Sequence, residues 1–93
     1  MATTTTQKAK NFQGTPLKEL ELKDVPGVGE VSLGKLQDAN IDTSIGLMGQ
    51  FFLFKMKEQA MIDWLKDTCG IEEQFAKKTV EALAEKAKKL VEK

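Results

Sequence analysis

The sequence predicts an all-α protein that folds as a compact five-helix bundle. Apolar residues recur at spacings of three and four along most of the 93-residue chain, as on the buried face of a helix. Strand-like alternation of apolar and polar residues is missing over any useful length. Seven glycines and two prolines interrupt the helical pattern and divide it into short helices. A chain of this length forms a single domain with one core.

The composition is that of a reduced, intracellular globular protein. Hydrophobic residues make up 41% of the chain, which is too many for a disordered protein. The longest apolar run covers only residues 51–54, whereas a membrane span needs about 20 residues. The N-terminal residues are polar and contain no signal region, so we expect neither secretion nor a transmembrane segment. The single cysteine cannot form an internal disulfide.

The charged residues limit how this protein could bind nucleic acid. Acidic and basic residues balance at fourteen each, which argues against a binder that works by bulk charge. Every basic residue is lysine, so the guanidinium fork that most often reads guanine is missing. Binding would depend on local geometry, without recognition of base sequence. Because the chain has no histidine and no cysteine cluster, we expect no histidine-based catalysis, no metal site and no cofactor.

The first segment, residues 1–10, is predicted to be a flexible or loosely helical arm ahead of a helical domain at 11–93. Its run of threonines is either a disordered tail or a phosphorylatable arm. A turn is expected within 11–18, where Gly14 and Pro16 occur. A short helical turn then ends near Val25.

The second helix is predicted over residues 30–38. Before it, Pro26 disfavours a helical conformation at the preceding residue, and Gly27 and Gly29 can adopt φ values closed to other residues. Its inward face is expected to hold Val28, Val31 or Ser32, Leu33 and Leu36. Asn40 is predicted to end the helix in the left-handed conformation.

The third helix is predicted to follow Asp42 or Thr43, either of which can act as its N-cap. Its apolar stripe is expected to consist of Ile45, Met48, Phe51 and Phe52. Gly46 and Gly49 interrupt this helix, and each costs roughly 1 kcal/mol relative to alanine. Small residues allow another backbone to approach, so we expect tight packing at these glycines.

Two further helices complete the predicted bundle. The fourth covers 57–68 and is ended by Gly70. Its buried side is expected to carry Ala60, Met61, Trp64 and Leu65. The last helix runs from about Glu72 to the C-terminus, with a seam of Ala76, Val80, Leu83, Ala87 and Leu90. Such a seam also occurs in coiled coils, but it covers barely two heptads, which favours a core-facing helix. The outer face is expected to carry Lys77, Lys78, Lys86, Lys88 and Lys89.

The segment 22–41 carries the functional prediction. The string Pro26-Gly27-Val28-Gly29 is flanked by apolar residues in register, and it resembles the helix-hairpin-helix signature. At the start of the second helix of such a hairpin, backbone N–H groups lack carbonyl partners and can bind a phosphate. Lys35 could reach the same or the next phosphate. Because phosphates carry no base identity, the predicted activity is sequence-independent binding of double-stranded DNA.

The structural alternative for this string is a tight interhelical turn that binds nothing, and the apolar register around it argues against that alternative. Either glycine is expected to permit close approach of the DNA backbone. We therefore expect Gly27→Glu to abolish DNA binding and to leave the helical fold intact.

A second block of residues resembles the barrier-to-autointegration factor family. It comprises Trp64-Leu65-Lys66-Asp67-Thr68-Cys69-Gly70 with Gly49-Gln50-Phe51 and Lys55, preceded in matching order by Gln7, Lys8, Phe12, Pro16 and residues 27–31. The resemblance covers about residues 3–70. It implies a symmetric homodimer that bridges two DNA duplexes and compacts DNA. It also implies location in the nucleus, and in the cytoplasm as well, and binding to LEM-domain proteins of the inner nuclear membrane.

The resemblance also implies site residues, position by position. DNA contact is expected at Gln7, Lys8, Gly27, Val28, Gly29, Val31, Ser32, Lys35 and Lys77. The dimer interface is expected at Met48 and Gly49, and the groove for LEM-domain proteins at Leu53, Ala60 and Trp64. Phosphorylation is expected at Thr4, Thr5 and Thr6, where added negative charge beside Lys8 would repel DNA.

Several positions depart from the family pattern. Glu72 and Glu73 place acid near the expected DNA surface, Ala60 replaces a larger apolar residue, and residues 32–34 differ just after the hairpin. The C-terminal tail is rich in lysine and glutamate. A second hypothesis is therefore a dimeric protein-interaction module with weakened or lost DNA binding. We do not expect an enzyme, because the sequence lacks a cluster of acids with metal-ligand spacing and Cys69 is interpreted as a core residue.

Overall fold

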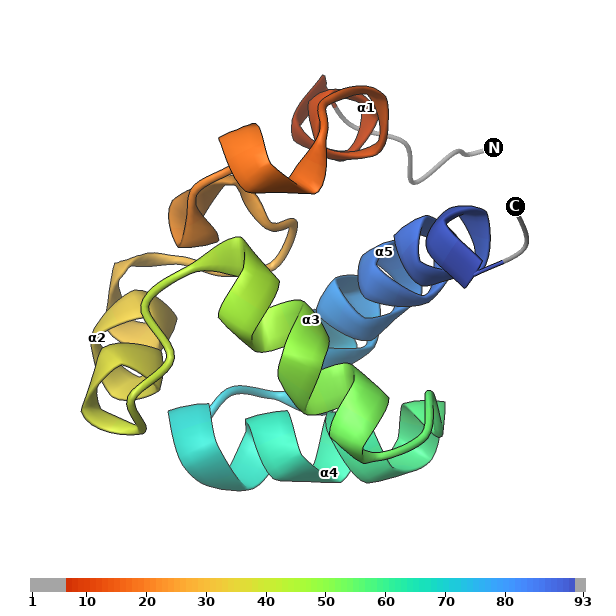
Figure 1. Cartoon of the computed structure of the whole chain (residues 1–93). Helices are drawn as coiled ribbons and strands as arrows, with labels where there is room; N and C mark the ends of the chain where they lie inside the picture. Colours follow the sequence, from red (N-terminus) through yellow and green to blue (C-terminus); the bar gives the residue numbers. More distant parts are fainter. Residues whose placement is uncertain (1–6, 92–93) are drawn as a thin grey trace.

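The structure is a computed structural model that describes residues 7–91, with side chains from residue 10 onward. Over this range the chain forms five α-helices and two single-turn 3-10 helices, without a strand (Figure 1). In chain order the elements are α1 (Gln7–Gly14), η1 (Leu17–Glu19), η2 (Leu22–Asp24), α2 (Glu30–Asp38), α3 (Ser44–Leu53), α4 (Glu58–Cys69) and α5 (Glu73–Val91). The predicted all-α, five-helix architecture is confirmed.

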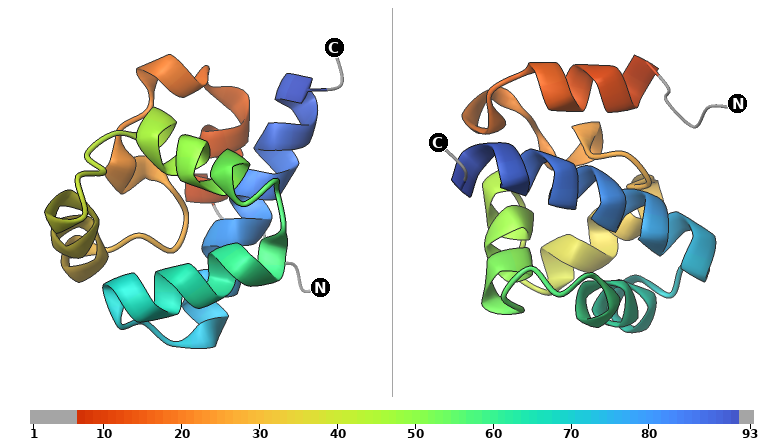
Figure 2. Two further views of the ribbon diagram at one scale, coloured as in Figure 1. Left: turned by 60° about the horizontal axis from the view of Figure 1, so that its bottom comes forward. Right: turned by 90° about the vertical axis from the view of Figure 1, so that its right-hand side faces the viewer.

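Helix α5 is the longest element, and α4, α3 and α1 all pack against it. In Figure 1, α1 lies at the top of the molecule and α4 at the bottom, with α3 and α5 between them. The second view of Figure 2 shows α1 crossing above α5. Helix α2 packs against α4 and η2, so the elements that flank the predicted hairpin belong to the same globule. A radius of gyration of 12.1 Å is that of one compact domain of this length.

A single hydrophobic core receives side chains from every α-helix and from η2. Its largest fully buried side chains include Phe12, Leu22, Leu36, Leu47, Met48, Phe51, Met61, Leu65 and Leu83. Burial of a side chain of this size contributes about 1.5–3 kcal/mol. The core therefore holds the flanks of the hairpin in a fixed relation to α5.

The helix ends follow the signals in the sequence. Asn40 has a φ of 70°, and the N–H of Ile41 donates to the carbonyl of Leu36 at 2.8 Å, which closes the C-terminus of α2 as predicted. Gly70 ends α4 with a φ of 68°. Of the two candidate N-caps of α3, Thr43 is the one used, because its side chain accepts a hydrogen bond from the N–H of Gly46 at 2.9 Å.

The first helix begins earlier than the arm prediction suggested. Residues 7–10, assigned to the arm, form the first half of α1, and the expected turn is confined to the segment after Gly14. Gln13 ties this helix to α5, since its Nε2 donates to the carbonyl of Ala82 at 2.9 Å. The threonines proposed as phosphorylation sites lie outside the described residues.

The apolar face of α3 differs from the predicted stripe. Met48 and Phe51 are buried together with Leu47, but Ile45 and Phe52 are exposed. Almost every residue of this helix is apolar or small, so its two sides differ little in polarity. The sequence therefore gives little indication of which side faces the core. One consequence is an apolar surface on the outside of α3.

Lys86 was predicted on the outer face of the last helix, and this prediction is wrong. The residue is only 6% exposed, and its Nζ donates to the carbonyls of Phe12 and Thr15, both at 2.7 Å. The ammonium also lies 5.1 Å from the centre of the Phe12 ring. Lys86 therefore fastens the C-terminal end of α1 to α5.

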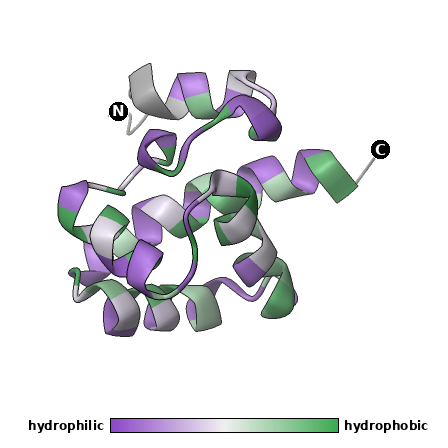
Figure 3. Cartoon of the chain, turned by 60° about the vertical axis from the view of Figure 1, so that its left-hand side comes forward, coloured by the Kyte–Doolittle hydropathy of each residue, from purple (hydrophilic) through white to green (hydrophobic). Residues whose placement is uncertain are grey.

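Four residues of the predicted α5 seam are buried, whereas the fifth, Leu90, is exposed near the end of the helix. The hydropathy colouring of Figure 3 shows this last turn of α5 as hydrophobic. Over the described range, no helix has the length and apolar character needed to cross a membrane.

Candidate nucleic-acid interface

The chain reverses direction before α2 in a tight turn from Val25 to Val28. The N–H of Val28 donates to the carbonyl of Val25 at 3.1 Å, and Gly27 has a φ of +86°. A proline in the second position and a positive φ in the third define a type II turn. Gly27 thus supplies the backbone conformation that the sequence predicts, since a residue with a side chain would be strained there.

Gly27 also lies directly against α5. A Cβ added to it would overlap Oγ1 of Thr79 and would approach the carbonyl oxygen of Phe75 to 2.9 Å. The hydroxyl of Thr79 donates to the carbonyl of Pro26 at 2.7 Å, in a buried contact. Any side chain at this position therefore disturbs the packing of the hairpin on α5. The expectation that Gly27→Glu would leave the fold intact is wrong for this reason.

Gly29 has a different role from Gly27. Its φ of −104° and ψ of −169° are those of extended backbone, so the unusual φ expected there is not observed. No atom lies within 4 Å of an added Cβ, and the residue is exposed. A side chain at Gly29 would therefore occupy the open space in front of α2.

The start of α2 is open to an anion. The N–H of Leu33 donates to the carbonyl of Gly29 at 2.8 Å, so the N–H groups of residues 30–32 precede the first intrahelical bond. The N-cap is a glycine, and no side chain caps the helix. These N–H groups carry the positive end of the helix dipole, which favours a phosphate.

The predicted DNA-contact residues divide according to exposure. Val31 is 68% exposed, and Gly29, Lys35 and Lys77 are also on the surface. Val28 and Ser32 are buried, so their side chains point into the core and only their backbones could contribute. Gln7 and Lys8 lie in the first turn of α1, and their side chains are outside the described part of the chain.

Acidic side chains lie close to this surface. Glu30 is exposed in the first turn of α2, and Glu72 and Glu73 are exposed where α5 begins, within a turn of Phe75. Two of them have polar partners. Glu73 forms an ion pair with Lys66 at 3.2 Å, and Glu72 accepts a hydrogen bond from Gln74 at 2.9 Å.

The outer side of α3 is the second candidate surface. Gly49 is half-buried with no atom within 4 Å of an added Cβ, so nothing in its own chain uses the close approach that a glycine allows. Met48, its predicted partner in the interface, is buried inside the chain. Ile45 and Phe52 flank Gly49 at spacings of four and three and are exposed. The spacing of Ile45 and Phe52 around Gly49 is visible in the sequence, but their exposure could not be predicted from it without knowing which side of the helix faces the core.

Leu53 lies in the last turn of α3, and Ala60 and Trp64 lie on α4, the helix that follows. Leu53 is 76% exposed, and the other two residues are half-buried one turn apart on α4. The rings of Phe54 and Trp64 pack edge to face with centroids 6.5 Å apart. Each of the three residues expected to form a partner groove is therefore at least partly accessible.

Metal-ligating side chains do not gather at one site in the described part of the chain. No group of three or more histidine, cysteine, aspartate or glutamate side chains in that part could hold a metal ion. Cys69 is buried, and this burial raises the pKa of its thiol, although a hydrogen bond to Ser32 and the charge of Lys35 act in the opposite direction. A protonated, enclosed thiol is a poor nucleophile, and this agrees with the prediction that Cys69 is a core residue.

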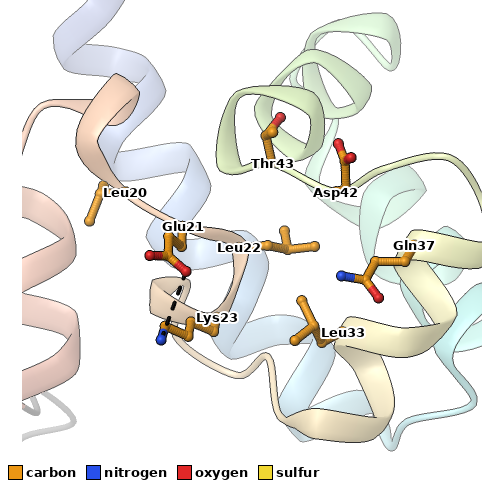
Figure 4. Close-up of a pocket in the computed structure, with 8 residues that line it drawn as sticks. All are labelled: Leu20, Glu21, Leu22, Lys23, Leu33, Gln37, Asp42 and Thr43. Carbon is orange, nitrogen blue, oxygen red and sulfur yellow. Dashed lines mark ion pairs between the residues drawn. The ribbon is translucent and has the colours of Figure 1, made fainter.

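A pocket of about 200 Å³ lies beside the hairpin elements but contains none of the turn residues. Figure 4 shows the side chains gathered around it from the η1–η2 segment, α2 and the segment just before α3. Its lining residues are Leu20, Glu21, Leu22, Lys23, Leu33, Gln37, Asp42 and Thr43. Glu21 and Lys23 form an exposed ion pair at 3.8 Å on its rim. The pocket is distinct from the open start of α2.

Comparison with known proteins identifies the family. A family model described as Barrier to autointegration factor matches residues 3–90. The chain is 39% identical over 67 residues to Barrier-to-autointegration factor of Homo sapiens, covering 72% of this chain and 75% of that protein. It is 36% identical over 81 residues to Barrier-to-autointegration factor 1 of Caenorhabditis elegans, covering 87% and 91% respectively. The chain therefore belongs to the barrier-to-autointegration factor family.

Proposed function

We propose that this protein binds double-stranded DNA without sequence preference and bridges duplexes as a homodimer, as an architectural protein of chromatin and the nuclear envelope. Membership of a family of non-enzymatic, DNA-binding chromatin proteins of the nucleus supports DNA binding in general. The observation that carries the proposal is the open start of α2, where backbone N–H groups precede the first intrahelical hydrogen bond.

Binding at this surface depends on few charges. Lys35 and Lys77 are the exposed cations expected to contact DNA among the described side chains, and the net charge of the whole chain is zero. Each phosphate neutralised by a lysine adds about 0.9 to the slope of log affinity against log salt. We expect a slope of roughly 2 per hairpin from these two lysines, which is small for a DNA-binding protein.

The homodimer is proposed to form through the outer side of α3. Ile45, Gly49 and Phe52 share one face, and the glycine at its centre would let the same helix of a second copy approach closely. In a symmetric dimer each copy would present its own hairpin, so that two duplexes could be held at once. The accessible Leu53, with Ala60 and Trp64, supports a proposed surface for LEM-domain proteins.

A second function is favoured by the acids near the hairpin. Glu30, Glu72 and Glu73 are exposed and would repel a phosphate backbone, although Glu73 is paired with Lys66. If this repulsion dominates, the protein is a dimeric interaction module of the same fold that has weakened or lost DNA binding.

The deciding experiment is a gel-shift series with unrelated duplexes at about 50 and 200 mM salt, run beside light scattering. Equal binding to all duplexes that falls with salt, and slow complexes from a dimer, are the expected results. The variant Gly29→Glu should abolish the shift, because it places a carboxylate in front of α2 where nothing in the chain is displaced. Gly14→Glu is the matched control, since it adds the same charge at an open glycine outside the hairpin. Absence of any shift for the wild-type protein would establish the interaction module instead.

The dimer has its own test. Gly49→Glu should give a folded monomer by light scattering, because an added side chain meets no atom of its own chain within 4 Å. A dimer that persists in this variant would place the interface elsewhere.

A further inference from the structure

The peptide that joins Pro26 to Gly27 lies against α5, and the open start of α2 follows shortly after it in the chain. Its carbonyl accepts the hydroxyl hydrogen of Thr79 at 2.7 Å, and the contact is buried. Thr79 itself is fully enclosed. The Gly27 N–H of the same peptide has no hydrogen-bond partner among residues 10–91.

The two ends of this peptide point in opposite directions. A trans peptide is planar, with its C=O and N–H antiparallel, and the described part of the chain contains no cis peptide. Because Thr79 holds the carbonyl toward α5, the N–H is directed away from α5. The Gly27 N–H therefore lies on the side opposite α5 and only shortly ahead of Gly29, the N-cap of α2.

The same peptide has an alternative orientation. Type I and type II turns differ by nearly half a turn of the peptide between their second and third residues. Proline in the second position is compatible with both types, and glycine in the third position can adopt either sign of φ. The sequence Pro26-Gly27 therefore permits both orientations, and a contact from outside the turn must select one of them.

We propose that Thr79 is a positioning residue for phosphate binding: its hydroxyl selects the type II turn and thereby directs the Gly27 N–H outward, beside the N–H groups of α2. This role rests on the proposed DNA-binding function. Without the hydroxyl, the Pro26 carbonyl would be buried without a donor, and rotation of the peptide would solvate it. The rotated peptide would present a carbonyl oxygen to the phosphate in place of an N–H.

The test compares Thr79→Val, which keeps the branched shape, with Thr79→Ser, which keeps the hydroxyl. Duplex affinity, measured by fluorescence anisotropy on a labelled duplex under conditions where each variant is fully folded, should fall about 5- to 10-fold in Thr79→Val. It should stay within about 2-fold of wild type in Thr79→Ser. Ser44→Ala is the matched control, because Ser44 also donates from a buried hydroxyl, to the carbonyls of Leu17 and Leu20 at 3.0 and 2.8 Å, away from the hairpin.

A second measurement does not depend on DNA. In a type II turn the α-proton of Pro26 lies close to the amide proton of Gly27, which gives a strong nuclear Overhauser effect that is weak in a type I turn. This effect should be strong in the wild-type protein and in Thr79→Ser, and weak in Thr79→Val. An unchanged effect in Thr79→Val would overturn the selection of the turn by Thr79, whether or not the protein binds DNA.

The remaining outcomes separate this inference from the function on which it rests. Wild-type binding with unchanged affinity in Thr79→Val would overturn the role of Thr79 alone. An equal loss of affinity in Ser44→Ala would also overturn it, since general destabilisation would then explain the effect. Absence of duplex binding by the wild-type protein would overturn the proposed function, and with it any role of Thr79 in phosphate binding.

Discussion

The two glycines of the hairpin should respond oppositely to the same substitution. In Gly27→Ala, the new methyl group would overlap the hydroxyl of Thr79 and the carbonyl region of Phe75, in a backbone conformation with a φ of +86°. The left-handed conformation costs alanine roughly 1–2 kcal/mol, and overpacking of a tight contact costs roughly 1–3 kcal/mol. The expected loss in the free energy of unfolding is about 2–5 kcal/mol, a large part of the stability of a domain this small.

Gly29→Ala should change stability very little. The residue has extended backbone angles, and an added methyl group meets no atom within 4 Å. Alanine is a poorer N-cap than glycine, so we expect a loss of at most about 1 kcal/mol. Its methyl group would nevertheless occupy the space in which a phosphate approaches α2, so DNA affinity should fall.

Urea unfolding followed by far-ultraviolet circular dichroism, together with duplex binding by fluorescence anisotropy, tests the pair. Gly27→Ala should lose stability, and Gly29→Ala should lose affinity with its stability retained. If Gly27→Ala is as stable as wild type, then Gly27 does not lie against α5 as described, and the assignment of separate roles to the two glycines is refuted.

Four further predictions concern stability and burial. Lys86→Met should lower the free energy of unfolding by about 2–3 kcal/mol and raise hydrogen exchange in α1, because two carbonyls lose a charged donor; unchanged exchange in α1 would contradict this. Desolvation by burial, and secondarily Lys89, lowers the pKa of Lys86, so the unfolded chain holds more protons on this group as the pH rises toward the usual pKa of lysine. In that alkaline window the difference in unfolding free energy between wild type and Lys86→Met should therefore grow with pH, and a difference that shrinks would contradict the assignment. Lys55→Gly should stabilise the protein by about 0.5–1 kcal/mol in thermal unfolding, because Lys55 ends α3 with a φ of 58°, and equal or lower stability would argue against strain at this turn. Cys69 should react with a disulfide reagent at least about 100-fold more slowly in the folded protein than in urea, since it is buried and burial raises its pKa, and rapid reaction would show that α4 opens readily.

Much of the fold follows from local signals in the sequence. Gly70 and Asn40 end their helices in the left-handed conformation as predicted, and α2 has the predicted bounds. These signals succeed because a positive φ or a missing N–H restricts the backbone whatever its surroundings.

The inward and outward sides of the helices were harder to predict, because tertiary contacts decide them. In the hairpin, the polar Ser32 is buried and the apolar Val31 is exposed, since the direction of α2 relative to α4 and η2 sets the buried side. The charge of Lys86 predicts a surface residue. Its buried partners are the carbonyls at the end of α1, and only the tertiary structure brings these close to it. Similarly, the need for a glycine at position 27 is predictable from the turn, but its contact with Thr79 is not, because 52 positions of chain separate the two residues.

Thr79 and Lys86 lie seven residues apart on α5, which is about two helical turns and therefore nearly the same face. One holds a carbonyl of the hairpin, and the other holds two carbonyls at the end of α1. The first turn of α1, with Gln7 and Lys8, and the hairpin are the two segments expected to contact DNA, and α1 also packs directly against η2, just ahead of the hairpin. Through Thr79 and Lys86, α5 therefore helps to set their relative position. A rotation or shift of this helix would move both contact regions together. Substitutions on the buried face of α5 should therefore affect DNA affinity, although only its outer face, rich in lysine and glutamate, is exposed to solvent.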